Sequence, residues 1–146
     1  MYSNILVPVD PTHVEVADRL IEVANKLVSD GGSITVVSII EPLPAYVQGY
    51  LAANALTDTI AANKNKARET LEQLQTKVPG TSHALLDEGH PPSEILRLAK
   101  EGNMDLIILG SHRPALKDYM LGSTAARVVR HAECSVIVER SVIVRQ

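Results

Sequence analysis

The sequence predicts a single α/β domain built on a doubly wound, mostly parallel sheet of five strands with four helices. Three observations lead to this fold class. Five short apolar runs alternate with stretches of helical periodicity, and parallel neighbours need such crossover connections. The apolar residues, 45% of the chain, include no Phe or Trp, so the core must be built from aliphatic side chains that suit buried strands. The length of 146 residues fits one domain.

The first three elements follow one another closely. The run NILVPVD, residues 4–10, is predicted to be a buried strand that stops at Pro and Asp. Thr12 and Glu15 have the spacing of a capping box, which predicts a helix start. This helix is expected to end near residues 30–32, and the β-branched run at 33–40 predicts the second strand. The apolar stripe of the helix comprises Val14, Ala17, Leu20, Ile21, Ala24, Leu27 and Val28.

The later elements are set by proline, glycine and periodicity. Residues 41–54 contain two prolines and a glycine, which predicts an irregular connection. A long amphipathic helix is expected from about 55 to 78, because Pro79 and Gly80 end its periodic pattern. The remaining predicted elements are a strand at 82–89, a helix from Pro91, a strand at 104–109, a helix at 122–132 and a strand at 134–139.

Composition excludes several classes of partner. Fourteen basic and seventeen acidic side chains give a formal charge of −3 without a long run of either sign, so neither nucleic acid nor an anionic membrane is suggested. No export or membrane signal is recognised, and we expect a cytoplasmic protein. The one cysteine, Cys134, is interpreted as a buried structural thiol. No His/Cys cluster has metal-ligand spacing, and no nucleophile elbow occurs.

The stretch LGSHRPALKDYMLGST, residues 109–124, is the strongest candidate for a binding loop. In a doubly wound sheet, ligands bind beyond the carboxyl ends of the strands. If the first and fourth strands are neighbours, Asp10 therefore lies beside this loop. The loop ends in Gly122, Ser123 and Thr124 at a predicted helix start, where free backbone amides and hydroxyls are available to a phosphate. Gly110 has no side chain, so the backbone can approach a ligand there. On spacing alone, two glycines serving only a turn and a cap are an equal alternative, since the loop lacks both the Walker and the dinucleotide fingerprints.

Longer strings point to a family. The chain resembles the universal stress proteins from end to end, in ILVPVD, in GHPPSEILRLAKEGNMDLIILGSHR and in LGSTAARVVRHAECSVIV. Within that family it looks most like the F-type branch, in which SHRP and RHAECSV occur together. The resemblance implies a five-stranded parallel sheet and a homodimer through the last strand. It also implies, for one subgroup, ATP bound by Gly-x-x-Gly, nine residues, then Gly-Ser/Thr.

This sequence departs from that ATP pattern at two points. Gly110 matches the first glycine and Gly122-Ser123 match the final pair. Arg113 stands at the position of the second glycine, and only eight residues instead of nine separate it from Gly122. An arginine can grip a phosphate with two donors, so we interpret the loop as a variant site. His112 is a phosphate candidate, with an exposed loop histidine as the equal alternative. The resemblance further implies that the ribose and adenine lie against Pro8, Val9, Asp10, Ile39 and Leu109.

These observations support three hypotheses. The first is a homodimeric module that holds ATP, with Mg²⁺ or Mn²⁺ as the candidate ion, and whose occupancy changes its partners or its oligomer stability. The second is a slow ATPase or phosphotransferase on the same crevice, although no positioned nucleophile is recognised. The third is a nucleotide-free interaction protein like the A-type members, with Arg113 filling the pocket. The tail at 140–146 repeats SVIV and is a candidate extra edge strand, which would favour pairing between two chains.

Overall fold

The computed structural model describes residues 1–50, 53–111 and 121–140, and these ranges form one α/β domain. Its five strands are all parallel and lie in the order β3-β2-β1-β4-β5. The predicted five-stranded parallel sheet is therefore confirmed. In chain order the elements are β1 (Tyr2–Pro8), α1 (Val14–Leu27), β2 (Val28–Ile40), α2 (Ala45–Gln48), α3 (Ala53–Gln75), β3 (Thr81–Glu88), α4 (Pro91–Glu101), β4 (Leu106–Gly110), α5 (Ser123–His131) and β5 (Ser135–Glu139).

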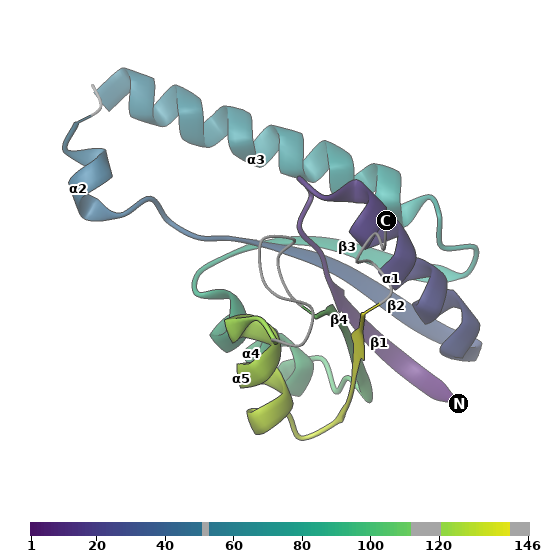
Figure 1. Ribbon diagram of the computed structural model, residues 1–146. Helices are drawn as coiled ribbons and strands as arrows, with labels where there is room; N and C mark the ends of the chain where they lie inside the picture. Colours follow the sequence, from purple (N-terminus) through teal and green to yellow (C-terminus); the bar gives the residue numbers. More distant parts are fainter. Residues whose placement is uncertain (51–52, 112–120, 141–146) are drawn as a thin grey trace, which may run out of the picture.

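Two helical layers cover the sheet (Figure 1). Helices α1 and α3 lie on one face, and α4 and α5 lie on the other. Successive residues of β1 serve opposite faces: Ile5 and Val7 pack with α1 and α3, while Leu6 packs with α4 and α5. All three side chains are fully buried. This two-sided burial explains why the central strands read as continuous apolar runs rather than as an alternating pattern.

The structure contains five helices where the sequence predicts four, within the described residues. The additional helix is α2, a single turn in the stretch predicted to be irregular. Pro44 precedes it with φ of −56°, and its carbonyl oxygen accepts hydrogen bonds from the amides of Val47 and Gln48. Proline favours this geometry at a helix start because its ring fixes φ near the helical value. The prediction missed one turn because two prolines were interpreted only as breakers.

The predicted capping box before α1 is wrong. The N-cap residue is His13, and it makes no side-chain capping hydrogen bond. The Thr12 hydroxyl instead donates to the Asp10 carboxylate over 2.6 Å, and the Thr12 amide donates to the same oxygen over 2.9 Å. In a capping box the threonine oxygen accepts an amide hydrogen bond from the third helical residue. Helix α1 begins at Val14, so Thr12 lies one residue before the N-cap and its hydroxyl serves as a donor to Asp10 instead.

The boundary between α1 and β2 also differs from the prediction. Helix α1 ends at Leu27, and Val28 already pairs with Tyr2 of β1. The register then shifts, so that Asn4 pairs with Ser33. Gly31 lies inside this irregularity with φ of +79°, a conformation that favours glycine. The glycines thus mark an irregular strand rather than a helix end.

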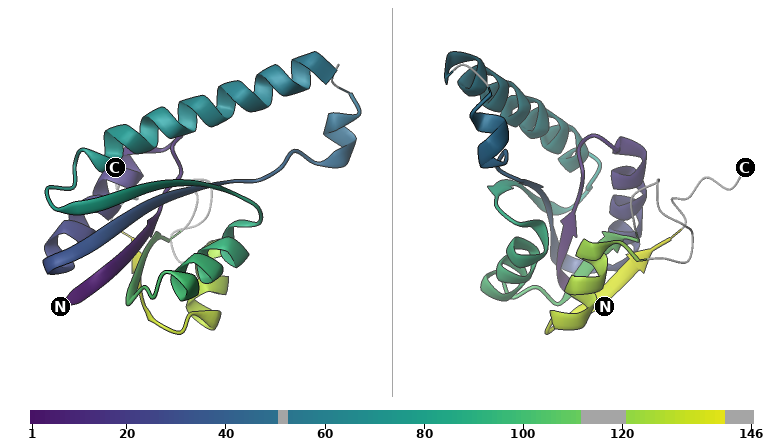
Figure 2. Two further views of the ribbon diagram at one scale, coloured as in Figure 1. Left: turned by 180° about the vertical axis from the view of Figure 1, so that it is seen from behind. Right: turned by 60° about the vertical axis from the view of Figure 1, so that its left-hand side comes forward.

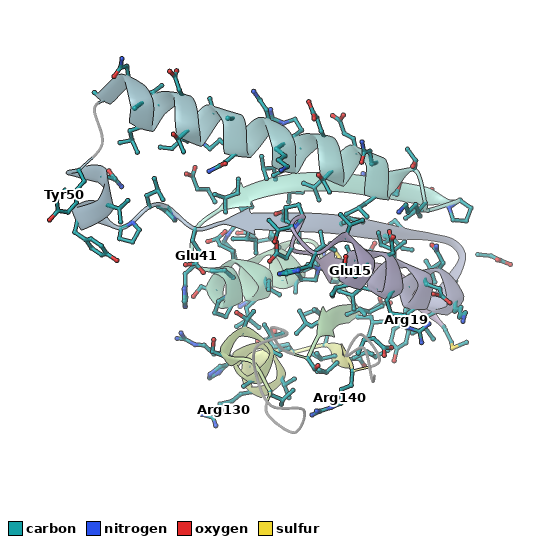
Figure 3. All side chains as sticks on the ribbon, turned by 45° about the horizontal axis from the view of Figure 1, so that its top comes forward. Glu15, Arg19, Glu41, Tyr50, Arg130 and Arg140 are labelled. Carbon is teal, nitrogen blue, oxygen red and sulfur yellow. The ribbon has the colours of Figure 1, made fainter. Side chains whose placement is uncertain are left out.

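Helix α3 is anchored by only one half of its length. Its buried residues are Ala67, Leu71 and Leu74, all in the second half. The first half and α2 project past the sheet as an arm, which both views in Figure 2 show. Tyr46 and Tyr50 on this arm are 73% and 88% exposed. Figure 3 places Tyr50 at the far end of the arm, away from the body of the domain.

At the amino ends of the strands, the carboxylate of Asp105 joins β1 to the start of β4. Asp105, just before β4, accepts hydrogen bonds from the amides of Ser3 and Asn4 at 2.8 and 2.9 Å. The start of β1 is thereby tied to the start of its neighbour β4. The candidate extra strand at 141–146 lies outside the described residues.

Candidate functional site

The carboxyl ends of β1 and β4 meet at one edge of the sheet. The two strands are parallel neighbours, with Leu6 paired to Ile107. The chain continues from β1 to β2 on one side and from β4 to β5 on the other, so the strand order reverses between them. This reversal is where α/β sheets bind ligands. The structure therefore brings Asp10, after β1, and Gly110, at the end of β4, to the same edge.

A backbone hydrogen bond closes the candidate binding loop at its base. The Gly122 amide donates to the Ser111 carbonyl oxygen over 2.8 Å, and the Ser111 amide donates to the Glu139 carbonyl oxygen over 3.1 Å. Ser111 is only 4% exposed. Gly110 and Gly122, twelve positions apart in the sequence, thus lie close together. His112 and Arg113 fall in residues 112–120, outside the described ranges.

Helix α5 begins directly after this closure. Gly122 is its N-cap, and a glycine has no side chain with which to cap the helix. The Gly122 carbonyl oxygen accepts the Ala126 amide at 2.9 Å, which starts the helical ladder. The amides of the first turn, including those of Ser123 and Thr124, therefore have no intrahelical acceptor. Such amides and the helix dipole favour an anion in front of the helix.

Packing against the described residues does not require glycine at Gly110. A Cβ atom added there would lie 3.5 Å from Cγ1 of Val16, which is an ordinary contact. Its backbone is also outside the positive-φ region. The fold itself would accept alanine at this position, so the packing leaves the choice of glycine unexplained.

Asp10 stabilises the turn before α1 and is still open to solvent. One carboxylate oxygen accepts both hydrogen bonds from Thr12, and the other lies 3.9 Å from Nε2 of His13. The Asp10 side chain is 60% exposed. Asp10 can therefore shape this turn and also accept hydrogen bonds from a ligand hydroxyl.

Three other predicted site residues, Pro8, Val9 and Leu109, do not offer an exposed polar side chain to a ligand. Val9 and Leu109 are 8% and 4% exposed and belong to the two sides of the core. The Val9 amide already donates to the Val37 carbonyl oxygen over 2.8 Å. Pro8 is half-buried and pairs with Val37 in the sheet. These positions shape the edge with backbone atoms rather than with reactive side chains.

A pocket of about 380 Å³ opens beside Asp10, between the end of β2 and the middle of α3. It contains two of the predicted site residues, Asp10 and Ile39. The wall supplied by α3 was not predicted from the sequence, although the helical spacing of its lining residues is visible there. The lining residues are Asp10, Pro11, Thr12, Ser38, Ile39, Ile40, Asn63, Lys66, Ala67 and Thr70.

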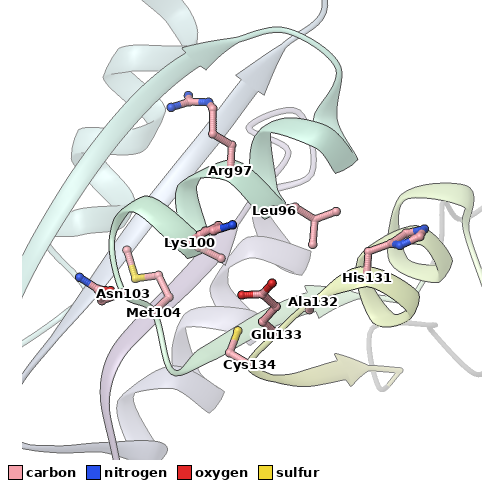
Figure 4. Close-up of a pocket in the computed structure, with 10 residues that line it drawn as sticks. Leu96, Arg97, Lys100, Asn103, Met104, His131, Ala132, Glu133 and Cys134 are labelled. Carbon is pink, nitrogen blue, oxygen red and sulfur yellow. The ribbon is translucent and has the colours of Figure 1, made fainter.

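A second, wider pocket of about 710 Å³ lies near Asn103, Met104 and Cys134, at the opposite edge of the sheet (Figure 4). Arg97 on its rim bonds Glu94, Glu101 and Asp87 and is held by them. Cys134 is half-buried, and burial raises the pKa of its thiol. The thiol is therefore protonated at neutral pH, which agrees with a structural role. None of the predicted site residues that the structure describes lines this pocket.

Within residues 1–50, 53–111 and 121–140, no three His, Cys, Asp or Glu side chains gather in a way that could hold a metal ion. In the same ranges, no helix is both long and apolar enough to cross a bilayer.

Comparison with known proteins decides the family. Residues 1–140 match the model of the Universal stress protein family. The chain belongs to this family. It is 32% identical to universal stress protein G of Escherichia coli O157:H7 over 149 aligned positions, which cover 96% of this chain and all of that protein.

Solved structures support the same fold for this universal stress protein. The structure of the hypothetical protein MJ0577 has a TM-score of 0.72 and 25% identity, covering 94% of this chain and 95% of the other. A family member from Arabidopsis thaliana solved with AMP bound has a TM-score of 0.62 and 20% identity, covering 93% and 90%. A universal stress protein solved in complex with cAMP has a TM-score of 0.60 and 17% identity, covering 95% and 97%.

Proposed function

We propose that this universal stress protein binds an adenine nucleotide, ATP in the first place, and acts as a regulatory module whose state depends on nucleotide occupancy. One observation carries the proposal: the Asp10 pocket and the start of α5 lie at the same edge of the sheet, on the two sides of the point where the strand order reverses. The structures with AMP and cAMP show that proteins of this fold hold such ligands.

The nucleotide would lie across the ends of β2, β1 and β4. Asp10 would accept the ribose hydroxyls, and Ile39 would border the base. The phosphates would face Gly110, Gly122, Ser123 and Thr124, with His112 as a further phosphate contact and Arg113 adding positive charge from the loop. Pro8, Val9 and Leu109 would contribute backbone, since the side chains of Val9 and Leu109 are buried in the core.

A divalent ion would arrive with the phosphates rather than occupy a site made by the protein. Mg²⁺ commonly binds through one or two carboxylates together with substrate phosphates. Asp10 is the one acidic residue on the wall of the described pocket, and one of its oxygens is engaged by Thr12. The residues thus fit Mg²⁺ or Mn²⁺ carried by the nucleotide, and the ion would supply charge neutralisation there.

The proposal extends to a homodimer formed through β5. This strand is at the end of the sheet order and has β4 as its one described strand neighbour. Val136, Ile137 and Val138 along it are half-buried in the single chain. An apolar edge strand of this kind is a template for pairing with a second copy. The F-type branch and a cytoplasmic location remain part of the proposal and rest on the sequence patterns.

Native mass spectrometry of freshly purified protein tests the proposal, because a tight site keeps its nucleotide. We expect a mass increase equal to one adenine nucleotide per chain, released by denaturation. Incubation of the same protein with labelled ATP separates binding from hydrolysis, since a holder returns ATP intact over hours. Purified protein that carries no nucleotide and gives no heat with added ATP would refute the proposal and favour the nucleotide-free alternative.

A further inference from the structure

Ser38 presents an unpartnered hydroxyl to the pocket beside Asp10. The residue is 2% exposed and lines the pocket from β2. Within the described residues no side-chain hydrogen bond involves Ser38, and every fully covered side-chain nitrogen or oxygen has a partner. The Ser38 Oγ is therefore not fully covered, and the pocket is the space it reaches. A nearly buried hydroxyl without a partner is unfavourable, so a ligand atom that bonds it gains affinity.

Helix α3 supplies the facing wall. Asn63, Lys66, Ala67 and Thr70 have the i, i+3, i+4, i+7 spacing that places side chains on one face of a helix. Ala67 is buried, and the Thr70 hydroxyl donates to the Lys66 carbonyl oxygen over 3.0 Å. Thr70 keeps lone pairs that can accept a hydrogen bond.

Lys66 differs from its neighbour Lys64 in its electrostatic surroundings. Lys64 is paired with Glu88, with 3.5 Å between Nζ and the carboxylate. Lys66 has no ion-pair partner among the described residues. An ammonium group donates hydrogen bonds and cannot accept them. Lys66 therefore favours a ligand that offers acceptor atoms to this side of the pocket.

The remaining lining suits a flat ring. Pro11, Ile39, Ile40 and Ala67 provide apolar surface, and the polar groups of Ser38, Asn63 and Lys66 stand around it. The volume of about 380 Å³ is within the range of small-molecule sites. A nucleobase has this chemistry, because its faces are apolar and its edge carries ring nitrogens that accept hydrogen bonds.

We propose that Ser38 and Lys66 are specificity-determining residues that read the edge of the base in this pocket. Ser38 bonds the base from the β2 side, and Lys66 donates to an acceptor on it from the α3 side. The inference rests on the proposed nucleotide-binding function and deepens it, because it assigns base recognition to side chains of β2 and α3. It also predicts that base-free polyphosphates do not use these two residues.

Calorimetric titration with ATP, GTP and inorganic tripolyphosphate tests the assignment. Ser38→Ala is expected to weaken ATP binding about fivefold, the size of one neutral hydrogen bond, and Lys66→Met about tenfold or more. Both variants should reduce the preference for ATP over GTP. Tripolyphosphate affinity should stay within about twofold of wild type for Ser38→Ala, because the base is absent from this ligand.

Lys64→Met is the matched control for Lys66→Met, since it removes the same charge from the same helix outside the pocket. Thermal unfolding without ligand shows whether each variant is folded, and the exposed Lys66 keeps the test open if Ser38→Ala is destabilised. Wild-type protein that binds no nucleotide would refute the proposed function and this inference together. Wild-type protein that binds ATP, with both variants binding and discriminating as it does, would refute base reading alone. Equal losses for Lys64→Met and Lys66→Met with all three ligands would show that Lys66 acts only through its charge, against the assignment.

Discussion

The Gly122 amide donates a 2.8 Å hydrogen bond to the Ser111 carbonyl oxygen, and this contact joins the end of β4 to the start of α5. It fixes where the free amides of α5 point relative to the end of the strand. The hydrogen bond between the Ser111 amide and Glu139 extends the link to β5. These backbone hydrogen bonds position the base of the loop, so substitutions at Gly122 should affect ligands more than folding.

Replacing Gly122 by leucine should abolish nucleotide retention without unfolding the protein. Gly122 has φ of −64° and ψ of 157°, which other residues adopt freely, so the backbone would keep its course. The new side chain would stand in front of the α5 amides. We expect at least a tenfold loss of ATP affinity by calorimetry, on the general scale of losing one charge-assisted hydrogen bond. Gly80→Leu is the control, since nothing lies within 4 Å of a Cβ there. An unchanged affinity for Gly122→Leu would place the phosphates elsewhere.

Replacing Asp10 by alanine should remove the preference for ATP over 2′-deoxy-ATP. The carboxylate would no longer accept a ribose hydroxyl, and the two hydrogen bonds from Thr12 would also be lost. Thr12→Val keeps the carboxylate and removes only the hydroxyl donor, so it should retain the preference. Competition binding with the two nucleotides measures the effect. Equal discrimination by wild type and Asp10→Ala would argue against a ribose contact.

The Arg97 cluster should make stability depend on pH at the acidic end. Burial acts to raise the pKa of Asp87, but hydrogen bonds with the Glu94 side chain and the Glu88 backbone, together with Arg97, outweigh it and lower this pKa below 3.8. A lowered carboxyl pKa stabilises the folded state above the ordinary value and loses that contribution as pH falls through the folded value. Arg97→Met should therefore reduce the free energy of unfolding at pH 7, and the difference from wild type should shrink as the pH drops below 3.8.

Urea titration of wild type and Arg97→Met at pH 7 and pH 3 measures this dependence. Arg68→Met, which removes an exposed arginine from α3, is the comparison for loss of charge alone. A gap between wild type and Arg97→Met that is equally large at both pH values would show that Asp87 is not the group responsible.

The inner and outer halves of α3 should differ in their contribution to stability. Leu71 is 1% exposed and packs in the core, so Leu71→Ala should lower the free energy of unfolding by about 2 to 5 kcal/mol. Leu56 is half-buried and lies in the half of the helix that has no buried residue, so Leu56→Ala should cost well below that amount. Chemical denaturation of the two variants compares them directly. Similar losses would mean that the arm packs as tightly as the helix end.

A charge on β5 should dissociate the proposed dimer. Val138 is half-buried near the end of the edge strand. Val138→Lys should shift the molar mass from two chains to one at micromolar concentration, measured by light scattering after size exclusion. Val129→Lys places the same charge on α5, where the side chain is already 47% exposed, and should leave the mass unchanged. A wild-type protein that is monomeric at this concentration would exclude the β5 dimer.

The sheet was predictable because its central strands are buried on both faces. Continuous aliphatic runs such as Ile5 to Val7 and Leu106 to Leu109 have few alternatives in a chain of this length. The adjacency of β1 and β4 then placed Asp10 beside the Gly110 loop. Local signals were less reliable, because Thr12 can accept a hydrogen bond from a helix amide or donate one to Asp10, and only the folded geometry shows that it donates to Asp10.

The α3 wall of the pocket was the part of the site that the sequence did not yield. Asn63, Lys66 and Thr70 lie about 30 residues after the strand they face, and nothing local marks them as partners of Ser38. Their helical spacing is also that of any solvated face. Only the packing of Ala67, Leu71 and Leu74 against the sheet turns this face toward the end of β2.

The Asp105 carboxylate that holds the amides of Ser3 and Asn4 joins groups about 100 residues apart in the chain. On the ribosome, β1 therefore waits for most of the polypeptide to emerge before it gains its second neighbour and its clamp. Until then one edge of this central strand is exposed, and this is the interval in which a chaperone or a sister chain can reach it. Because β1 pairs with β4 only late in synthesis, we expect the folding yield of this protein to depend on the rate of translation.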